Sequence, residues 1–303
     1  MTDNPLRDRV LDWPSKNRVY LTLDLECDYG TALNWNTYEA LDAVDRLVEL
    51  LEELAIPLTC FVQTEVLDER PDAVETLRNS TVETEFHPHS HKHSRRERTT
   101  VRDEIERSTR RYRDFFDAPP LGYRFPNGNV KPRDYRQLAE YGFRFDASVF
   151  PTWRPGRFNQ LTSATEPRYL AEYELFELPF TVYTDLVRIP TALSFCRLLG
   201  RPFVTALSRR PPPVLVFNVH MHDLVTPASH ADLPLPYRLV YARNDNGFYI
   251  LERLLRSLSR SEYRFETIGE AYTALRDRTC EASERGSGVS SPLADRIEHK
   301  RMY

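Results

Sequence analysis

The chain has 303 residues, enough for one large domain with a sizeable core. Its 41 basic and 45 acidic side chains give a formal net charge of −4, and 41% of the residues are hydrophobic. This composition is typical of a soluble globular protein, and it gives no bulk attraction to nucleic acid or to anionic lipid. No apolar run reaches the length of a membrane span, so none is expected.

The beginning of the chain and its cysteines bear on the cellular compartment. The segment Met1–Lys16 is polar and charged, without a positive-then-apolar signal segment, so we expect a cytoplasmic protein. The cysteines form no CxxC pair and are expected as reduced thiols. Cys27 lies beside candidate site residues, although a buried structural thiol is the simpler interpretation.

Apolar periodicity predicts strands alternating with helices. Strands are predicted over 19–23, 57–62, 82–86, 122–124, 143–147, 175–178, 214–219 and 263–267. Helices are predicted over 38–55, 96–116, 247–258 and 269–275. This alternation indicates an α/β fold with a largely parallel sheet. Residues 1–17 are expected as an N-terminal extension and 276–303 as a flexible C-terminal tail, because the composition turns to serine, glycine and charge.

The predicted helix over 96–116 is rich in arginine, which would be compatible with a nucleic-acid patch. Asp103 and Arg107 are four residues apart, however, and so are Glu106 and Arg110. Such spacing pairs opposite charges along one helix face. We therefore interpret this surface as a solvated, self-paired face and expect no nucleic-acid partner.

Every second residue from 87 to 93 is a histidine, in the run His87-Pro88-His89-Ser90-His91-Lys92-His93. Histidine is the commonest metal ligand and the usual proton carrier near neutral pH. In an extended strand all four rings would face the same way, whereas a helical turn after a strand would let the i, i+4 pair His89 and His93 close on one ion. A surface histidine patch or a pH-sensitive loop is the alternative interpretation.

Three carboxylates, Asp24, Glu26 and Asp28, follow the first predicted strand. Such a group repels itself unless a cation or an arginine lies within it. Asp24 most needs a partner, because it ends an apolar strand, where an unpaired charge is costly. Capping of a helix, or a turn at Asp28-Tyr29-Gly30, is the structural alternative.

Two later segments also bring polar groups to strand ends. A turn explains the proline and the glycine of Arg124-Phe125-Pro126-Asn127-Gly128, but it does not explain Arg124, whose fork could orient a carboxylate such as Asp24. The apolar strand over 214–219 delivers His220 to its exit. Sites at the carboxyl ends of strands are the rule in parallel α/β folds.

These segments resemble the motifs of the polysaccharide deacetylase family, the NodB-homology domain of carbohydrate esterase family four. His89–His93 fits the family pattern H-[ST]-x-x-H, and Arg124–Gly128 fits R-x-P-x-G. Phe145–Ser148 is similar to the fourth motif, and Val219-His220 to the last. The first motif departs from the usual two adjacent aspartates, because Leu25 stands between Asp24 and Glu26.

The resemblance runs over residues 18–275 and implies a distorted, incomplete (β/α) barrel of seven or eight strands. It implies a divalent metal, with zinc as the expected ion, held by Glu26, His89 and His93. Asp28 is a rival to Glu26 for the third ligand. An open position would remain for water and substrate.

The resemblance also implies the catalytic roles. Asp24 would be the general base, His220 the acid that protonates the leaving amine, and Arg124 the residue that holds Asp24. Asp223 or Asp146 would orient His220. The implied reaction removes an acetyl group from an N-acetylated sugar or glycan precursor.

Aromatic residues near the motifs are candidates for stacking on sugar rings, although core packing explains each equally well. They are Trp35, Trp153, Tyr29 and Tyr123. A second hypothesis is a carbon–nitrogen hydrolase of the same fold acting on a cyclic amide, a formamide or a small N-acyl compound. A third is an inactive carbohydrate-binding member, which the presence of base, arginine and acid candidates disfavours.

Overall fold

The computed structural model describes residues 8–93, 99–154, 158–241 and 246–287. The first sheet contains, in spatial order, β11 (Val214–His220), β2 (Arg18–Leu25), β3 (Leu58–Val62) and β4 (Thr84–Pro88), and β12 (Arg264–Phe265) also pairs with β2. All its strand pairs are parallel. The second sheet contains β1 (Arg9–Val10), β9 (Arg168–Leu170), β10 (Leu175–Glu177), β6 (Phe145–Asp146) and β5 (Gly122–Tyr123), of which β10, β6 and β5 are parallel. A separate ribbon pairs β7 (Trp153–Arg154) with β8 (Phe158–Asn159).

Hydrogen bonds join the two sheets at both edges. At the β4–β5 edge, the backbone N–H of Arg124 donates to the carbonyl of Pro88 at 3.1 Å. At the other edge, Thr181, which follows β10, accepts the N–H of Val216 in β11 at 2.9 Å. Side chains of both sheets also pack in one apolar cluster, which includes Tyr20, Phe61 and Phe145. The structure therefore has the α/β fold with parallel strands that the sequence predicts. No ladder of strand pairs joins the two sheets among the described residues, so the barrel that the resemblance implies is incomplete.

Alternation along β2 separates the helix-facing side of the sheet from the barrel interior. Leu21 and Leu23 belong to the core between this sheet and its covering helices, whereas Tyr20 packs in the interior cluster. Thr22 and Asp24 continue the inward face toward the carboxyl end of the strand. Each buried leucine stabilises the fold by roughly 1.5–3 kcal/mol. The interior is therefore apolar at one end and polar at the other.

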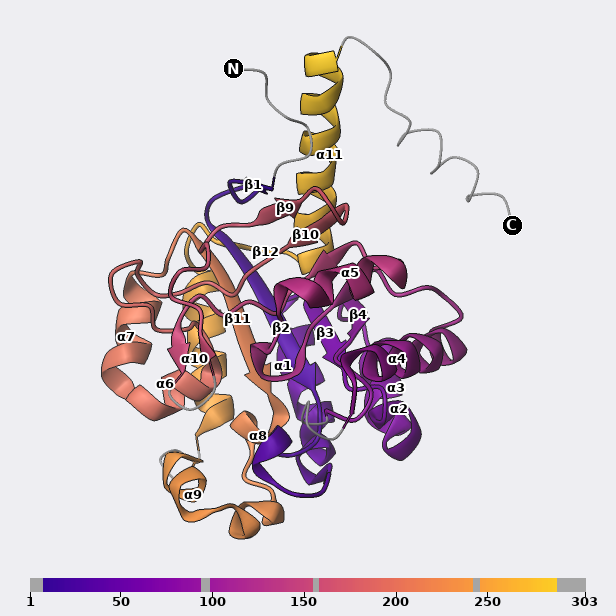
Figure 1. Ribbon diagram of the computed structural model, residues 1–303. Helices are drawn as coiled ribbons and strands as arrows, with labels where there is room; N and C mark the ends of the chain where they lie inside the picture. The colour runs from indigo at the N-terminus through magenta and orange to yellow at the C-terminus, as the bar shows by residue number, and fades with distance from the viewer. Residues whose placement is uncertain (1–7, 94–98, 155–157, 242–245, 288–303) are drawn as a thin grey trace.

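Helices cover the outside of both sheets. They are α1 (Val44–Leu54), α2 (Val66–Glu69), α3 (Pro71–Asn79), α4 (Val101–Phe116), α5 (Pro132–Glu140), α6 (Leu193–Leu199), α7 (Arg201–Arg209), α8 (Met221–Leu224), α9 (Leu235–Tyr241), α10 (Gly247–Ser259) and α11 (Ile268–Ser287). Short 3₁₀ turns are η1 (Gly30–Ala32), η2 (Glu39–Ala43), η3 (Pro126–Gly128) and η4 (Ala228–Asp232). In Figure 1, α11 lies at one end of the strands and α8 at the other. None of the helices in the described ranges is long and apolar enough to cross a membrane.

The two ends of the chain depart from the sequence-based expectation. The predicted flexible tail is wrong over residues 276–287, where α11 continues to Ser287. Good helix formers such as alanine, arginine and glutamate favour this continuation, and Tyr272 and Leu275 anchor the helix in the interior cluster. Residues 288–303 of that expectation lie outside the described residues. At the other end, Trp13 is buried and β1 pairs with β9, so residues 8–17 of the expected extension pack on the domain, and residues 1–7 lie outside the described residues.

The helix predicted over 96–116 begins at Val101, and residues 94–98 lie outside the described ranges. Thr100 explains the start, because its hydroxyl oxygen accepts the N–H of Asp103 at 3.1 Å. The expectation did not include α3, α5, α6 and α7. Each of these helices buries only three residues in its contact face, which leaves a weak periodic signal.

Gly122→Ala should lower the free energy of unfolding by about 1–3 kcal/mol, because an added Cβ would lie 2.1 Å from the Cζ atom of Phe145 on β6. Urea unfolding measures the change. The second change Phe145→Leu removes the clashing ring atoms, so the double variant should be more stable than the sum of the single effects predicts. Simple additivity would contradict this packing.

Candidate active site

The register of the parallel strands brings the candidate residues to one edge. His220 on β11 pairs directly with Asp24 on β2. Leu25 pairs with Val62, and Val62 pairs with Pro88. The residues that follow these strands, Glu26 and His89, therefore emerge at the same level. This is the carboxyl end of the sheet, where the sequence predicts the site.

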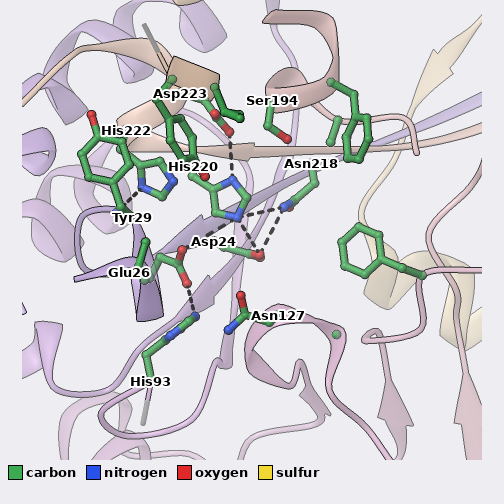
Figure 2. Close-up of a pocket in the computed structure, with 18 of the residues that line it drawn as sticks. Asp24, Glu26, Tyr29, His93, Asn127, Ser194, Asn218, His220, His222 and Asp223 are labelled. Atoms are coloured by element: carbon green, nitrogen blue, oxygen red, sulfur yellow. Dashed lines mark hydrogen bonds and ion pairs between the residues drawn. The ribbon is translucent and has the colours of Figure 1, made fainter. Parts of the chain in front are cut away.

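Glu26, His89 and His93 form a compact buried cluster. The Oε2 atom of Glu26 lies 3.1 Å from Nε2 of His89 and 2.7 Å from Nε2 of His93. One potential ligand atom from each residue lies within 4.8 Å of the other two. Figure 2 shows Glu26 and His93 pointing toward each other in the pocket. The structure thus brings together the three residues predicted as metal ligands.

The hydrogen bonding of His89 tests whether this cluster suits a cation. Its Nδ1 atom lies 2.9 Å from the carbonyl oxygen of Arg124, so Nδ1 must carry a hydrogen and donate it. In a neutral ring Nε2 is then an acceptor, and it faces the carboxylate of Glu26, which is also an acceptor. Two acceptors face each other stably when a proton or a metal cation lies between them. Two imidazoles and one carboxylate are a donor set that zinc and related divalent ions accept, so the residues fit a metal.

The loop that presents His93 is irregular and not a helical turn. Ser90 and His93 both have positive φ angles, of 63° and 54°. The Ser90 hydroxyl oxygen accepts the N–H of His93 at 3.1 Å. Glu104 on α4 accepts the N–H groups of His91 and Lys92, each at 2.9 Å. The expected helical closure is therefore wrong in geometry, although His89 and His93 do converge.

The other two histidines of the run point elsewhere. Nδ1 of His87 accepts the N–H of Gly122 at 3.3 Å, on the seam between the sheets. Nδ1 of His91 lies 3.1 Å from the Thr64 hydroxyl. Both rings have structural partners, so the run contributes two residues to the cluster and two to packing around it.

The rival ligand Asp28 is occupied by its own loop. Its carboxylate accepts hydrogen bonds from the Thr37 hydroxyl at 2.9 Å and the Ser229 hydroxyl at 3.2 Å. It also accepts the N–H groups of Glu39 and Ala40 at 3.0 and 3.1 Å. Asp28 therefore fixes the segment between β2 and η2. This geometry favours Glu26 as the carboxylate of the cluster.

Asp24 is held by a buried arginine. Nη1 of Arg124 donates to Oδ1 of Asp24 at 2.7 Å, and the side-chain amide of Asn218 donates to Oδ2 of Asp24 at 3.1 Å. The guanidinium lies between the rings of Phe61 and Phe180, at 3.8 and 4.3 Å from their centroids. Burial alone would raise the pKa of Asp24, but Arg124 and the nearby histidines outweigh burial and hold that pKa below its usual value. Asp24 is therefore a carboxylate at neutral pH.

His220 is oriented by Asp223, three residues later on α8. Nδ1 of His220 donates to Oδ2 of Asp223 at 2.9 Å, and Nε2 faces Oδ2 of Asp24 at 3.5 Å (Figure 2). Burial opposes the charged imidazolium, but the hydrogen bonds to Asp223 and Asp24 and the charge of Glu26 outweigh it and raise the pKa of His220. This ring can therefore hold a proton that faces the pocket.

Asp146 does not orient His220, contrary to one of the two expectations. Its carboxylate accepts the hydroxyl and the N–H of Ser148, at 2.5 and 3.2 Å. Burial raises the pKa of Asp146 to about 8. Because Asp146 ends β6 on the opposite sheet, it stabilises the turn there and leaves the orienting role to Asp223.

The aromatic candidates divide between core and surface. Tyr123 is fully buried against Phe125 and Phe143, so the expectation that it stacks on substrate is wrong. Tyr29 is also buried, and its N–H donates to Nδ1 of His222 at 3.1 Å. The two tryptophans are exposed, Trp35 by 52% and Trp153 by 59%. Of the expected stacking residues, these two remain available to a ligand.

The cysteines contribute packing. All four are free thiols, and Cys27 is completely buried. The backbone N–H of Cys27 donates to the side chain of Gln63 at 2.9 Å. Cys27 is not part of the clusters of potential ligands found among the described residues. The structural interpretation of this residue therefore holds.

The sequence interpretation missed Asn218 and Thr22, which complete the partners of Arg124. Nη1 of Arg124 donates to the Thr22 hydroxyl oxygen at 3.0 Å and to Oδ1 of the Asn218 side-chain amide at 2.9 Å. The sequence did contain a signal for both residues. Thr22 stands two positions before Asp24, and Asn218 stands two positions before His220, so each shares a strand face with a predicted site residue. His222 is a further lining residue, and burial together with His220 lowers its pKa to about 4.

These groups surround a pocket of about 160 Å³. Its polar floor contains Asp24, Glu26, His89, His93 and His220. An apolar wall faces this floor, formed by Phe150, Phe195, Leu198, Val240 and Tyr241. A carboxylate with an arginine partner, a histidine with a carboxylate partner and a candidate metal cluster thus converge on one small cavity. The structure is therefore an α/β protein with a candidate catalytic site at the carboxyl ends of its strands.

The comparisons with known proteins agree with this class. Residues 14–145 match the family model for polysaccharide deacetylase. Over this segment, which is less than half of the chain, the protein is similar to the polysaccharide deacetylase family. Asp24, the three cluster residues and Arg124 lie inside the matched segment, whereas His220 and Asp223 lie beyond it. No curated protein matches the chain.

Solved structures share the fold at low sequence identity. A Mycobacterium smegmatis protein assigned as a polysaccharide deacetylase has a TM-score of 0.60 and 18% identity, over 89% of this chain and 94% of that one. PuuE allantoinase has a TM-score of 0.56 and 14% identity, over 87% and 91% of the two chains. A mutant with restored activity of a pseudoenzyme from carbohydrate esterase family four has a TM-score of 0.50 and 13% identity, over 86% of this chain and 68% of that one. At these identities the likeness concerns the fold alone.

Arg124→Met should lower the free energy of unfolding by about 3–5 kcal/mol, because it leaves the carboxylate of Asp24 buried without a counter-charge. Urea unfolding at pH 7 gives the value. Arg136→Met is the matched control, since Arg136 pairs with Glu172 on the surface with both side chains more than 60% exposed. Such a pair contributes about 0–1 kcal/mol. Equal losses in the two variants would contradict the role given to Arg124.

Proposed function

We propose that this protein is a metal-dependent deacetylase, which hydrolyses the N-acetyl group of an amino sugar or glycan precursor to an amine and acetate. The observation that carries the proposal is the convergence of two paired proton-transfer groups on the Glu26–His89–His93 cluster. Asp24 has Arg124 as its partner, and His220 has Asp223. The similarity of residues 14–145 to the polysaccharide deacetylase family supports the same reaction.

Glu26, His89 and His93 would hold the metal, and we propose zinc because the set of two imidazoles and one carboxylate suits it. When bound, such an ion supplies Lewis-acid polarisation of the amide carbonyl and activation of a water molecule. The buried setting of the three residues excludes bulk solvent from the cluster. His89 is further fixed by the bond from its Nδ1–H to the carbonyl of Arg124.

The chain's own residues would carry the protons. Asp24 is ionised and accepts the proton of the attacking water, while Arg124 and Asn218 hold its two oxygens in place. The water oxygen bonds to the carbonyl carbon, and the carbon–nitrogen bond then breaks. His220 gives its proton to the departing nitrogen, because Asp223 fixes Nδ1 and leaves the Nε2–H facing the pocket. The products are acetate and the free amine.

One observation favours a second candidate, hydrolysis of a small cyclic amide, formamide or N-acyl compound. The catalytic pocket encloses only about 160 Å³, below the roughly 300–1,000 Å³ of most ligand sites. A small amide would be accommodated by this pocket alone. Parallel assays of acetate release from N-acetylglucosamine and of ring opening in cyclic ureides distinguish the two. An inactive carbohydrate-binding protein is disfavoured, because each catalytic position carries a group able to perform its role.

His89→Ala and His93→Ala should each remove stoichiometric metal, since two remaining ligands hold an ion too weakly. Metal content after dialysis is measured by mass spectrometry. His87→Ala and His91→Ala are the matched controls, because their rings have partners outside the cluster. Glu26→Ala should lose metal and Asp28→Ala should keep it. Full occupancy in the His89 and His93 variants would disprove the ligand assignment.

His220→Ala should lower turnover of an N-acetyl amine by about 10²- to 10⁴-fold while metal content is unchanged. The same variant should retain most activity on an aryl acetate ester, whose phenolate departs without a proton. Asp24→Asn should impair both substrates, because the water must still lose its proton. Rates on the two substrates, measured at one pH, give the comparison. Equal losses on amide and ester in His220→Ala would rule out the acid role.

A further inference from the structure

The apolar wall of the catalytic pocket continues onto the outer surface of α9. Tyr237 and Val240 line the pocket, yet their side chains are 37% and 45% exposed. Leu235 and Leu239 of the same helix are 62% and 63% exposed, and none of the residues of α9 is buried. These four side chains, which we call the α9 strip, extend from the pocket to the surface of the protein.

The helical spacing makes the α9 strip one continuous surface. Tyr237 and Val240 are three residues apart and share the face that lines the pocket, whereas Leu235 and Leu239 are four apart and share the neighbouring face. Arg238 is the only charged residue of α9. A surface helix normally turns its apolar residues to the core, and clustered exposed apolar side chains mark a binding surface. The strip is therefore suited to an apolar ligand that also enters the pocket.

The strip lies on the side of the pocket that holds the candidate acid. On α6, Nη1 of Arg197 lies 3.8 Å from Oδ1 of Asp223, the residue that orients His220. Nη2 of the same arginine donates to the carbonyl of Tyr241, the last residue of α9, at 3.2 Å. Arg197 thus joins the helix of the strip to the group that would protonate the departing amine. A chain on the strip would therefore belong to the amine part of the substrate and not to the acetyl group.

We propose that the α9 strip binds an aliphatic chain on the amine part of the substrate, which makes the substrate an N-acetylated amphiphile. This inference rests on the proposed deacetylase function. The catalytic pocket, of about 160 Å³, holds the reacting acetamido group, and the chain lies outside it on the strip. Each methylene that covers the exposed leucines leaves water and adds affinity, whereas a sugar hydroxyl would gain no such stabilisation there.

Calorimetric titration of the metal-loaded His220→Ala variant with the methyl and octyl β-glycosides of N-acetylglucosamine, both kept below micelle-forming concentrations, tests the strip without turnover. We expect the octyl glycoside to bind at least tenfold more tightly than the methyl glycoside. Adding Leu235→Gln and Leu239→Gln should reduce this gain to threefold or less, and glutamine keeps the helix propensity of leucine. Val10→Gln is the matched control and should keep the full gain, because Val10 is also 63% exposed but lies on β1, at the opposite end of the molecule from α9 (Figure 1).

Equal affinity for the two glycosides, or equal loss of the gain in the leucine and Val10 variants, would overturn the chain site. Sedimentation that shows a dimer dissociated by Leu239→Gln would assign the strip to a second copy of the protein and overturn it as well. The proposed function is assayed separately, by acetate release from the methyl glycoside with the wild-type protein. Release together with equal affinities would leave the deacetylase standing and remove the chain site. Octyl binding that depends on the two leucines, without acetate release, would do the reverse.

Discussion

The buried pair of Arg124 and Asp24 is the constraint on which the rest of the site depends. A guanidinium removed from water is costly unless it has hydrogen-bond partners, and Nε and Nη1 of Arg124 have four between them. It reaches Asp24 and Asn218 on two strands of the first sheet, and its Nε–H donates to the carbonyl of Ala147 beside the second. The same side chain therefore links the two sheets and fixes the position of the candidate base.

The candidate metal cluster is built on this linkage. The carbonyl of Arg124 accepts the Nδ1–H of His89 and so sets which nitrogen of that ring faces Glu26. His93 depends on a different support, the loop held by Glu104 from α4. His89 is thus held where β4 meets β5, and His93 is held through its loop by α4. A shift of either element would open the cluster, which makes the barrel shape a direct requirement of the site.

The comparisons concern the fold of the protein, and the chain's own side chains give the catalytic pocket its shape. The catalytic pocket is small, and its wall from α6 and α9 is apolar. A second hollow with a polar lining shares Gly30 and His93 with this pocket.

The order of residues alone predicts the strand ends and the residue types that gather there. Apolar strands followed by Asp24, His89, Arg124 and His220 specify a common edge, because parallel strands bring their carboxyl ends together. It also determined most of the long helices through their periodicity. The spacing of the histidine run indicated that two rings converge, although the loop that achieves this is irregular and its positive φ angles are not encoded in a local pattern.

Contacts in the folded chain distinguish between residues of similar chemistry. Asp28 is a rival to Glu26 for the third ligand in sequence, but the loop before α1 and the Ser229 hydroxyl take up the oxygens of Asp28. Asp146 and Asp223 are equally plausible partners of His220, yet only Asp223 lies on the same side of the barrel. Tyr123 is buried while Trp35 is exposed. These choices depend on contacts between segments far apart in the chain, and the one-dimensional order of residues carries no signal for such distances.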